Sequence, residues 1–249
     1  MKNWEFTDIH SHIIPGVDDG SENMEISMRL IEEAYEDGIR TMIATPHFGI
    51  INPDYNPKKV KDNFAALCEK VSEVHPDMKL YLGNELFLAP GYADGLEDKM
   101  SNTMAKTKYV LIEFPDSASF DLIYHQVRRL LVAGYTPIFA HAERYMGAYK
   151  DVKGLRELKN QGIMIQVNSN SIASLAEEEK GLFKRKDPFK KLVREMLEEG
   201  LVDFVATDIH DLPGRKPHMT QAKDVMIDII GQEETERILI DNPKWIIKG

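Results

Sequence analysis

The chain has 249 residues, of which 43% are apolar and 29% are charged, a composition typical of a globular protein. Its formal net charge of −10 argues against non-specific nucleic-acid binding, because phosphate backbones are bound by clustered Lys and Arg. No stretch approaches the ~18 apolar residues that a membrane span requires, and the first residues contain no apolar signal core. We therefore expect a cytoplasmic protein without membrane insertion, folded as one domain over residues 1–249.

Short aliphatic and β-branched runs alternate with longer amphipathic stretches along the chain. The short runs predict seven strands, at 4–10, 41–47, 80–86, 109–115, 136–143, 164–170 and 204–210. The longer stretches predict helices at 21–38, 57–74, 120–133, 151–161, 188–199, 220–231 and 233–240. Ser21 is predicted as the N-cap of the first helix. This alternation is typical of βα units and a parallel sheet, so the expected class is α/β.

Nearly every predicted strand ends in a side chain that can bind a metal ion. In chain order these residues are His10, His12, His47, Glu85, Glu113, His141, Asn168, Asp208 and His210. In parallel α/β folds the C-terminal strand ends form the functional face, because the loops there converge on one opening. We therefore expect these side chains to meet at one rim of the fold.

The segments "DIHSH" and "ATDIH" each place two of these candidates two residues apart. Residues i and i+2 of a strand point to the same side, so His10 and His12 would present two imidazoles on one face. A single histidine at a strand end is more often a hydrogen-bonded or capping residue. However, five of the eight histidines lie at strand ends, together with carboxylates that would be costly to bury unpaired. The combination predicts a multinuclear metal site.

This ordered set of motifs resembles the PHP (polymerase and histidinol phosphatase) superfamily. It is more closely similar to the bacterial protein-tyrosine phosphatases of capsule and exopolysaccharide operons, the CpsB/CapC type. The motifs are "DIHSHIIPGVDDGS", "ATPHF", "GNE", "IEFP", "HAERY" and "TDIHDLPGRKPH", and they span nearly the whole chain. The resemblance implies a distorted (β/α)7 TIM-like barrel that holds three divalent metal ions.

Carried over by position, the resemblance also implies which residues hold the ions. The implied sets are His10, His12, Glu85 and Asp208 for the first ion, Glu85, Glu113 and His141 for the second, and Asp19, His47 and His210 for the third. Counting along the "DDG" turn leaves Asp18 and Asp19 open as the ligand, and the family pattern favours Asp19. Imidazole and carboxylate ligands without thiolate fit manganese, iron or zinc, and the family implies manganese.

Phosphate ester hydrolysis at such a site needs no protein nucleophile. Divalent ions lower the pKa of bound water and can provide hydroxide for in-line attack on phosphorus. The only cysteine, Cys68, is followed by "EKVSEV", which lacks the arginine that cysteine-type tyrosine phosphatases require. Arg144 and Arg215 lie just beyond ligand-bearing strand ends, and matching arginines occur in the family. Their planar guanidinium groups are suited to bind phosphoryl oxygens, so we predict both as catalytic residues.

The resemblance implies a phosphatase that acts on the Tyr-rich tail of a bacterial tyrosine kinase and so regulates capsular or exopolysaccharide synthesis. The connection "GIINPDYNPKK" after His47 is a candidate wall for the phenyl ring. Alternatives are a small-molecule phosphomonoesterase such as histidinol-phosphate phosphatase, a catalytically idle PHP binding module, and the PHP nuclease associated with DNA polymerases. The acidic charge disfavours the nuclease, and the idle module predicts lost ligands, of which none is missing.

Overall fold

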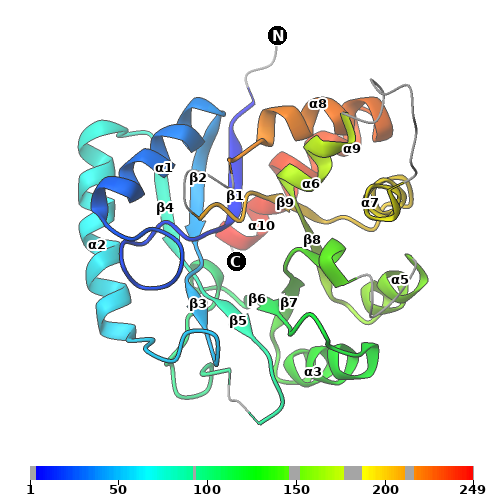
Figure 1. Cartoon of the computed structure of the whole chain (residues 1–249), viewed down its shortest axis with the longest axis horizontal. Coiled ribbons are helices and arrows are strands. Elements are labelled where there is room, and N and C mark those ends of the chain that lie inside the picture. The colour runs from blue at the N-terminus through cyan, green and yellow to red at the C-terminus, as the bar shows by residue number, and fades with distance from the viewer. Residues whose placement is uncertain (1–3, 92–93, 146–151, 177–186, 211–215, 249) are drawn as a thin grey trace.

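Parallel strands lie at the centre of the structure and helices surround them (Figure 1). The computed structural model describes residues 4–91, 94–145, 152–176, 187–210 and 216–248. One sheet has the order β1-β2-β4, from β1 (Phe6–Ser11), β2 (Ile39–Ala44) and β4 (Lys79–Leu82). The other has the order β3-β5-β6-β7-β8-β9, from β3 (His47–Phe48), β5 (Glu85–Phe87), β6 (Tyr109–Glu113), β7 (Thr136–Phe139), β8 (Met164–Asn168) and β9 (Phe204–Ala206). Every strand pairing in these sheets is parallel.

Two of the seven predicted strands are interrupted in the middle. Thr45 and Pro46 separate β2 from β3, and Gly83 and Asn84 separate β4 from β5. Hydrogen bonding nevertheless continues across the interruption, because the Gly83 amide donates to the Ala44 carbonyl at 2.8 Å and the Glu85 amide donates to the Pro46 carbonyl at 3.3 Å. The strand segments therefore correspond to the seven strands that the sequence predicts.

The first and last strands join and bring the two sheets into one ring. The Asp208 amide donates to the His10 carbonyl at 2.9 Å, and the His12 amide donates to the Ile209 carbonyl at 2.9 Å. Ser11 and Ile209 form a parallel bridge at the same place. The predicted α/β barrel class is thus confirmed, and residues from opposite ends of the sequence meet beside the predicted ligands.

Most helices lie close to their predicted positions, but α6 was not predicted, and its first two residues were expected in the strand over 164–170. They are α1 (Met24–Glu36), α2 (Pro57–Val74), α3 (Phe120–Val132), α5 (Val152–Asn160), α6 (Ser169–Ala173), α7 (Pro188–Glu198), α8 (Met219–Ile230), α9 (Gln232–Glu236) and α10 (Asn242–Lys248). Short turns of other helical types are η1 (Met104–Lys106), η2 (Ala142–Tyr145) and η4 (Arg237–Asp241). No helix in the described part of the chain is both long and apolar enough to cross a membrane.

The predicted N-cap of the first helix is wrong. Asn23, not Ser21, caps α1, because the Asn23 side chain accepts a hydrogen bond from the Ile26 amide at 3.1 Å. The Ser21 hydroxyl donates instead to the Asn23 carbonyl at 2.9 Å and lies 2.7 Å from the Ser27 hydroxyl. Both residue types are good caps, and the contacts of the Ser21 hydroxyl with Asn23 and Ser27 decide between them.

The predicted C-terminal helix is also wrong in extent. The sequence predicts one helix over 233–240, whereas the structure has α9, the π-helical turn η4 and then α10, which was not predicted. Ile246 of α10 is fully buried and belongs to an apolar cluster with Ile9, Ile43, Leu111 and Phe204.

That apolar cluster fills the interior of the barrel, beneath the predicted ligands. Tyr109, Leu111 and Glu113 alternate along β6, so they share one face. The first two are members of the inner cluster and the third is a predicted ligand. A second, larger cluster joins the outward side of the strands to helix residues such as Leu30 and Val127. The metal centre therefore stands on a packed apolar floor, and α10 closes the far end.

We predict that Ile246→Ala lowers the free energy of unfolding by about 2–4 kcal/mol, because it removes buried methylene groups and leaves a cavity. Urea denaturation of the metal-free protein measures this change. Ile247→Ala, at the half-buried neighbour, is the matched control and should have a much smaller effect. Equal effects of the two substitutions would contradict the inference that Ile246 of α10 packs in the apolar interior of the barrel.

Candidate metal centre

All nine residues predicted as metal ligands lie together. Most are at or just beyond the C-terminal end of a strand, whereas His47 and Glu85 begin β3 and β5 and Asp19 lies in the turn after β1. Their ligand atoms form four overlapping groups, and within each group the atoms lie within 4.8 Å of one another. The groups are His10, His12 and Asp208; His10, Glu85 and His141; His47, Glu85 and Glu113; and His12, Asp19, His47 and His210. Glu85 belongs to two groups, as a bridging carboxylate would. Binding of metal ions by these residues stays a prediction.

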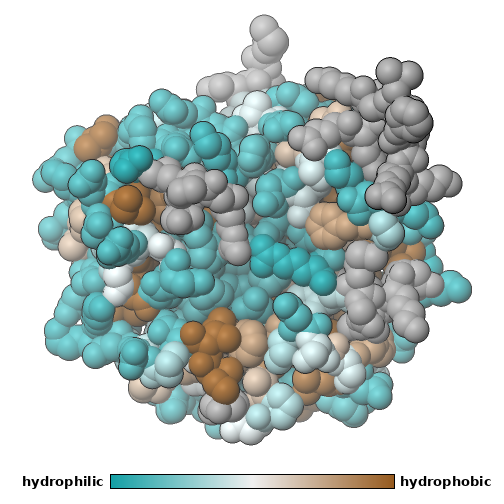
Figure 2. Space-filling model, in the orientation of Figure 1, coloured by the Kyte–Doolittle hydropathy of each residue, from teal (hydrophilic) through white to brown (hydrophobic). Residues whose placement is uncertain are grey.

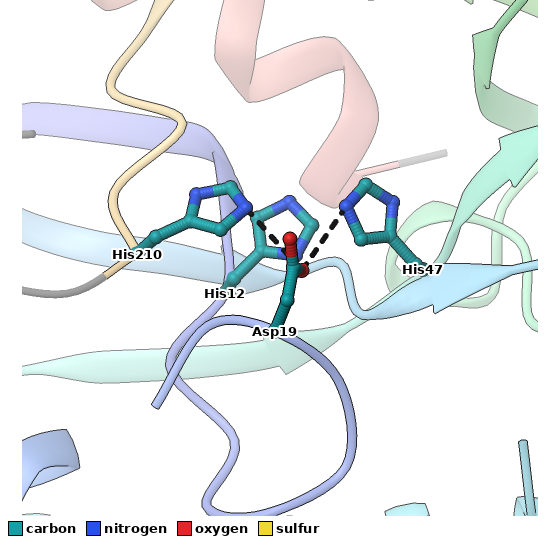
Figure 3. A group of neighbouring side chains, drawn as sticks. All are labelled: His12, Asp19, His47 and His210. Atoms are coloured by element: carbon teal, nitrogen blue, oxygen red, sulfur yellow. Dashed lines mark ion pairs between the residues drawn. The ribbon is translucent and has the colours of Figure 1, made fainter. Parts of the chain in front are cut away.

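The two acids of the "DDG" turn have different contacts. The Asp19 carboxylate lies between two imidazoles (Figure 3), with Oδ1 3.4 Å from His47 Nε2 and 3.6 Å from His210 Nε2. Asp18 Oδ2 instead lies 2.8 Å from His12 Nδ1 and accepts a hydrogen bond from the His47 amide at 3.1 Å. Asp19 therefore stays the predicted ligand, and Asp18 holds the outer ring nitrogen of His12.

The contact between Asp18 and His12 is a buried ion pair. Burial by itself would raise the pKa of Asp18, but the charge of His12 and its hydrogen bond lower that pKa to about 2. Burial likewise opposes ionisation of His12, whereas Asp18 and Glu85 raise the pKa of this imidazole well above its usual value. Because Asp18 holds Nδ1, the other ring nitrogen of His12 faces Glu85 Oε2 at 3.2 Å.

Three buried ligand atoms have no hydrogen-bond partner within the described structure: His47 Nδ1, Glu85 Oε2 and Glu113 Oε2. They converge, since His47 Nδ1 lies 3.1 Å from Glu85 Oε2 and 3.8 Å from Glu113 Oε2. Leaving a buried polar atom unpaired costs about 1–3 kcal/mol. A divalent cation would satisfy all three atoms at once, and this mixture of imidazole and carboxylate suits manganese, iron or zinc. The residues present therefore fit a metal centre.

A second convergence lies deeper, around the first strand. His10 Nε2 is 3.1 Å from His12 Nε2, 3.1 Å from Glu85 Oε2 and 3.4 Å from Asp208 Oδ1. All four side chains are buried. Two imidazole nitrogens and two carboxylates that face one point, away from water, are an expected donor set for a divalent ion.

Two amide side chains of β8 hold these ligands from behind. Gln166 Oε1 accepts a hydrogen bond from the His141 amide at 2.9 Å and lies 3.1 Å from His10 Nδ1. This oxygen can only accept, so Nδ1 of His10 carries the proton and Nε2 is free to face the metal site. Gln166 Nε2 donates to Asn168 Oδ1 at 2.8 Å, and Asn168 Nδ2 donates to Asp208 Oδ2 at 3.0 Å. Sequence analysis noted Asn168 and missed Gln166, although the spacing of two residues places both on one face.

A second residue that the sequence analysis missed is Asp8, two positions before His10. The Asp8 carboxylate accepts hydrogen bonds from the Thr207 amide at 3.0 Å, the Thr207 hydroxyl at 2.5 Å and the His10 amide at 3.2 Å. Burial raises the pKa of Asp8 to about 6. These bonds fix β1 to the end of β9, where His10 and Asp208 must meet.

Of the two predicted catalytic arginines, Arg144 is at the centre and Arg215 lies outside the described residues. Arg144 Nη2 donates to Asp208 Oδ2 at 2.6 Å, and the side chain is 35% exposed. It belongs to η2, which Tyr145 anchors by donating its hydroxyl to the Phe114 carbonyl at 2.6 Å. Arg144 thus reaches both a predicted ligand and open space.

That open space is a cavity of about 790 Å³, and six of the nine predicted ligands line it. Its lining includes Asp19, His47, Glu113, His141, Arg144, Asp208 and His210. The predicted wall segment at 49–59 contributes Ile51, Asn52, Asp54, Asn56 and Lys59. The segment therefore lines the same cavity as the predicted ligands, and its contact with a phenyl ring stays a prediction.

The fold and the site define a parallel α/β barrel protein with a candidate multinuclear metal centre at the carboxyl ends of its strands. The family model for capsular polysaccharide synthesis, CpsB/CapC, matches residues 6–248. The tyrosine-protein phosphatase CpsB of Streptococcus pneumoniae is 35% identical over 241 residues, which cover 96% of this chain and 97% of that protein. The chain therefore belongs to the CpsB/CapC family, and the family resemblance seen in the sequence is confirmed.

Solved structures agree with this assignment. One match is a crystal structure from a study of YwqE from Bacillus subtilis and CpsB from Streptococcus pneumoniae, which are called unique metal-dependent tyrosine phosphatases there. The TM-score is 0.82 and the sequence identity is 27%. The match covers 97% of this chain and 94% of that chain. A mutant organophosphorus hydrolase from Deinococcus radiodurans matches with a TM-score of 0.59 at 12% identity, over 98% of this chain and 93% of that one, which shows a shared fold.

We predict that Gln166→Leu weakens metal binding about 10- to 100-fold, because His10 loses the acceptor that fixes its tautomer. Calorimetric titration of the metal-stripped protein with Mn²⁺ measures the affinity. Gln161→Leu, on the exposed turn before β8, is the matched control and should leave the affinity unchanged. Unaltered binding by Gln166→Leu would mean that the amide only packs against the ligands.

We also predict that metal binding releases protons. Burial and the negative charges of Glu85 and Asp208 raise the pKa of Glu113 well above its usual range. Burial opposes protonation of His10, but Glu85 and Asp208 raise the pKa of this imidazole. Glu113 therefore holds a proton near neutral pH when no cation is bound, and a metal must displace it. Its affinity should fall as the pH is lowered.

Calorimetric titrations in buffers of different ionisation enthalpy count the released protons. Glu113→Gln should release fewer protons than the unaltered chain, because the amide has no proton to lose in this range. A binding enthalpy that is the same in all buffers would show that no proton leaves on metal binding.

Proposed function

We propose that this chain is a metal-dependent protein-tyrosine phosphatase of capsular or exopolysaccharide synthesis. The observation that carries the proposal is the convergence of nine metal-competent side chains, three of them (His47, Glu85 and Glu113) with converging buried atoms that lack a hydrogen-bond partner, and six of them in the lining of an open cavity. The relatives named as tyrosine-protein phosphatases align with nearly the whole chain, so their activity is the one that this site would perform.

The proposed ligand sets are those that the resemblance implies, with three divalent ions and manganese as the metal. Asp19 rather than Asp18 is the proposed ligand, because Asp18 is engaged with His12 and with the His47 amide. When bound, the ions would supply a hydroxide nucleophile and neutralise charge on the phosphoryl group.

Arg144 is the proposed phosphoryl clamp among the described residues. Its guanidinium group is anchored on Asp208 and extends into the cavity, where further N–H groups can donate to phosphoryl oxygens. These donors would stabilise the negative charge that develops on the phosphoryl oxygens in the transition state. Arg215, from the motif "TDIHDLPGRKPH", is proposed for a similar role.

The proposed reaction uses no cysteine nucleophile. Cys68 lies in α2 and is absent from the described lining of the cavity. Burial raises the pKa of its thiol, which makes the reactive thiolate scarce near neutral pH.

The finer proposals concern the substrate and its setting. We propose phosphotyrosine in the tail of a bacterial tyrosine kinase as the substrate, and the cytoplasm as the location, because such kinases use ATP inside the cell. Residues 1–249 are proposed as a single domain, in which the backbone hydrogen bonds Asp208–His10 and His12–Ile209 join the two ends of the chain. A small-molecule phosphomonoesterase would use the same metal centre and remains the second candidate.

The test compares a phosphotyrosine peptide with histidinol phosphate as substrates of the metal-stripped protein, before and after addition of Mn²⁺. We expect Mn²⁺ to restore hydrolysis of the peptide only. His10→Ala should abolish this activity because it removes a predicted ligand from the buried group of His10, His12 and Asp208, whereas Cys68→Ser should retain it. Preference for histidinol phosphate would replace the proposed substrate, and hydrolysis of neither compound would favour an idle binding module.

A further inference from the structure

An exposed aliphatic side chain stands beside the metal centre. Ile51 is 42% exposed and lines the cavity that holds the predicted ligands. Its neighbour Ile50 is also 42% exposed but is not part of the described lining. Figure 2 shows a hydrophobic patch on this face, over the segment that follows β3. An exposed aliphatic side chain in a cavity that six predicted metal ligands also line is suited to contact the apolar part of a ligand.

The segment that carries Ile51 is tied to the metal centre by hydrogen bonds. Asn52 Nδ2 donates to the carbonyl of the predicted ligand His47 at 3.0 Å, and to the Val17 carbonyl at 3.0 Å. The Asn52 amide also donates to the Gly49 carbonyl at 3.0 Å and closes a turn around Ile50 and Ile51. Ile51 is therefore held at a fixed position relative to His47, which reduces the ordering cost of binding.

Phe87 supplies a second apolar surface in the same cavity. It follows Glu85 by two residues on β5, so its side chain shares the face of that predicted ligand. Phe87 also pairs in register with Glu113 of β6. Gly49 packs against it so closely that an added Cβ would lie 2.9 Å from the Phe87 carbonyl oxygen. The Ile51 segment and Phe87 therefore lie next to each other at the metal centre.

We propose that Ile51 and Phe87 form the apolar wall that receives the aromatic ring of phosphotyrosine and so selects aryl over alkyl phosphate esters. This inference rests on the proposed function. A phosphoryl group held at the metal centre and Arg144 must direct its ester oxygen away from the buried ligands, into the cavity. The ring attached to that oxygen then contacts Ile51 and Phe87, whereas the single methylene of phosphoserine leaves both side chains exposed to water.

The test uses two peptides of identical sequence, one with phosphotyrosine and one with phosphoserine, and the Mn²⁺-loaded protein. Ile51→Ala should lower kcat/KM for the phosphotyrosine peptide about tenfold and leave that for the phosphoserine peptide unchanged. It should weaken binding of a peptide with the non-hydrolysable mimic phosphonomethyl-phenylalanine to the same extent, as measured by calorimetry. Ile50→Ala, with equal exposure outside the lining, should change neither quantity. Metal content should be the same in both variants.

Equal kinetics and equal binding for Ile51→Ala and Ile50→Ala would overturn the inference, as would a loss that is the same for both peptides. Failure of the proposed function has a different signature, because then the unaltered chain hydrolyses no phosphotyrosine peptide in the presence of Mn²⁺. Tyrosine phosphatase activity that persists undiminished in Ile51→Ala would therefore remove the aromatic wall and leave the proposed function in place.

Discussion

The buried carboxylate of Glu85 is the constraint on which the rest of the site depends. It lies 3.0 Å to 3.2 Å from nitrogen atoms of four histidines, His10, His12, His47 and His141. One carboxylate cannot satisfy four imidazoles, and the imidazoles cannot all be protonated so close together without repulsion. A divalent cation resolves the conflict, because each group then offers a lone pair to positive charge. The protein thus holds a set of donors whose mutual contacts are poor and whose contacts with metal would be good.

The sequence predicts that the candidate ligands lie together, as they do, because parallel strands convert a local pattern into a spatial one. Each of "DIHSH", "GNE", "IEFP" and "ATDIH" ends a strand, and strand ends in a parallel barrel share one rim, so Glu85 and Asp208 can be placed without knowing any other contact. Gln166 and Asp8 could not be found in this way. Their roles arise from the register between strands, which pairs Gln166 with His10 across 156 residues and Asp8 with Thr207 across 199. Local signals also failed where competing hydrogen bonds decide, as at Ser21.

The same rule explains why the choice between Asp18 and Asp19 required the structure. Both lie in one turn, and neither spacing nor composition separates them. The separation comes from His12, whose outer nitrogen needs an acceptor and takes Asp18. Asp19 is left at the surface, where its side chain is 71% exposed and reaches His47 and His210. The two neighbouring acids therefore have complementary contacts. Asp18 fixes the imidazole of His12. Asp19 is the predicted ligand in the group that also contains His12, His47 and His210.

Metal binding by His10 and Asp208 would be coupled to closure of the barrel through the seam between β1 and β9. The seam is joined by backbone hydrogen bonds of His10 and Asp208, and the side chains of these residues belong to one candidate metal group. A cation that binds both side chains therefore also holds together the first and last strands, which are the pairing of greatest sequence separation and the most costly to form in entropy. Asp8 also holds β1 to the end of β9, because its carboxylate accepts hydrogen bonds from Thr207. Burial raises the pKa of this carboxyl group and so opposes its ionisation. Asp8 and a bound metal ion would therefore both stabilise the contact between β1 and the end of β9, Asp8 from within the barrel and the ion from the rim.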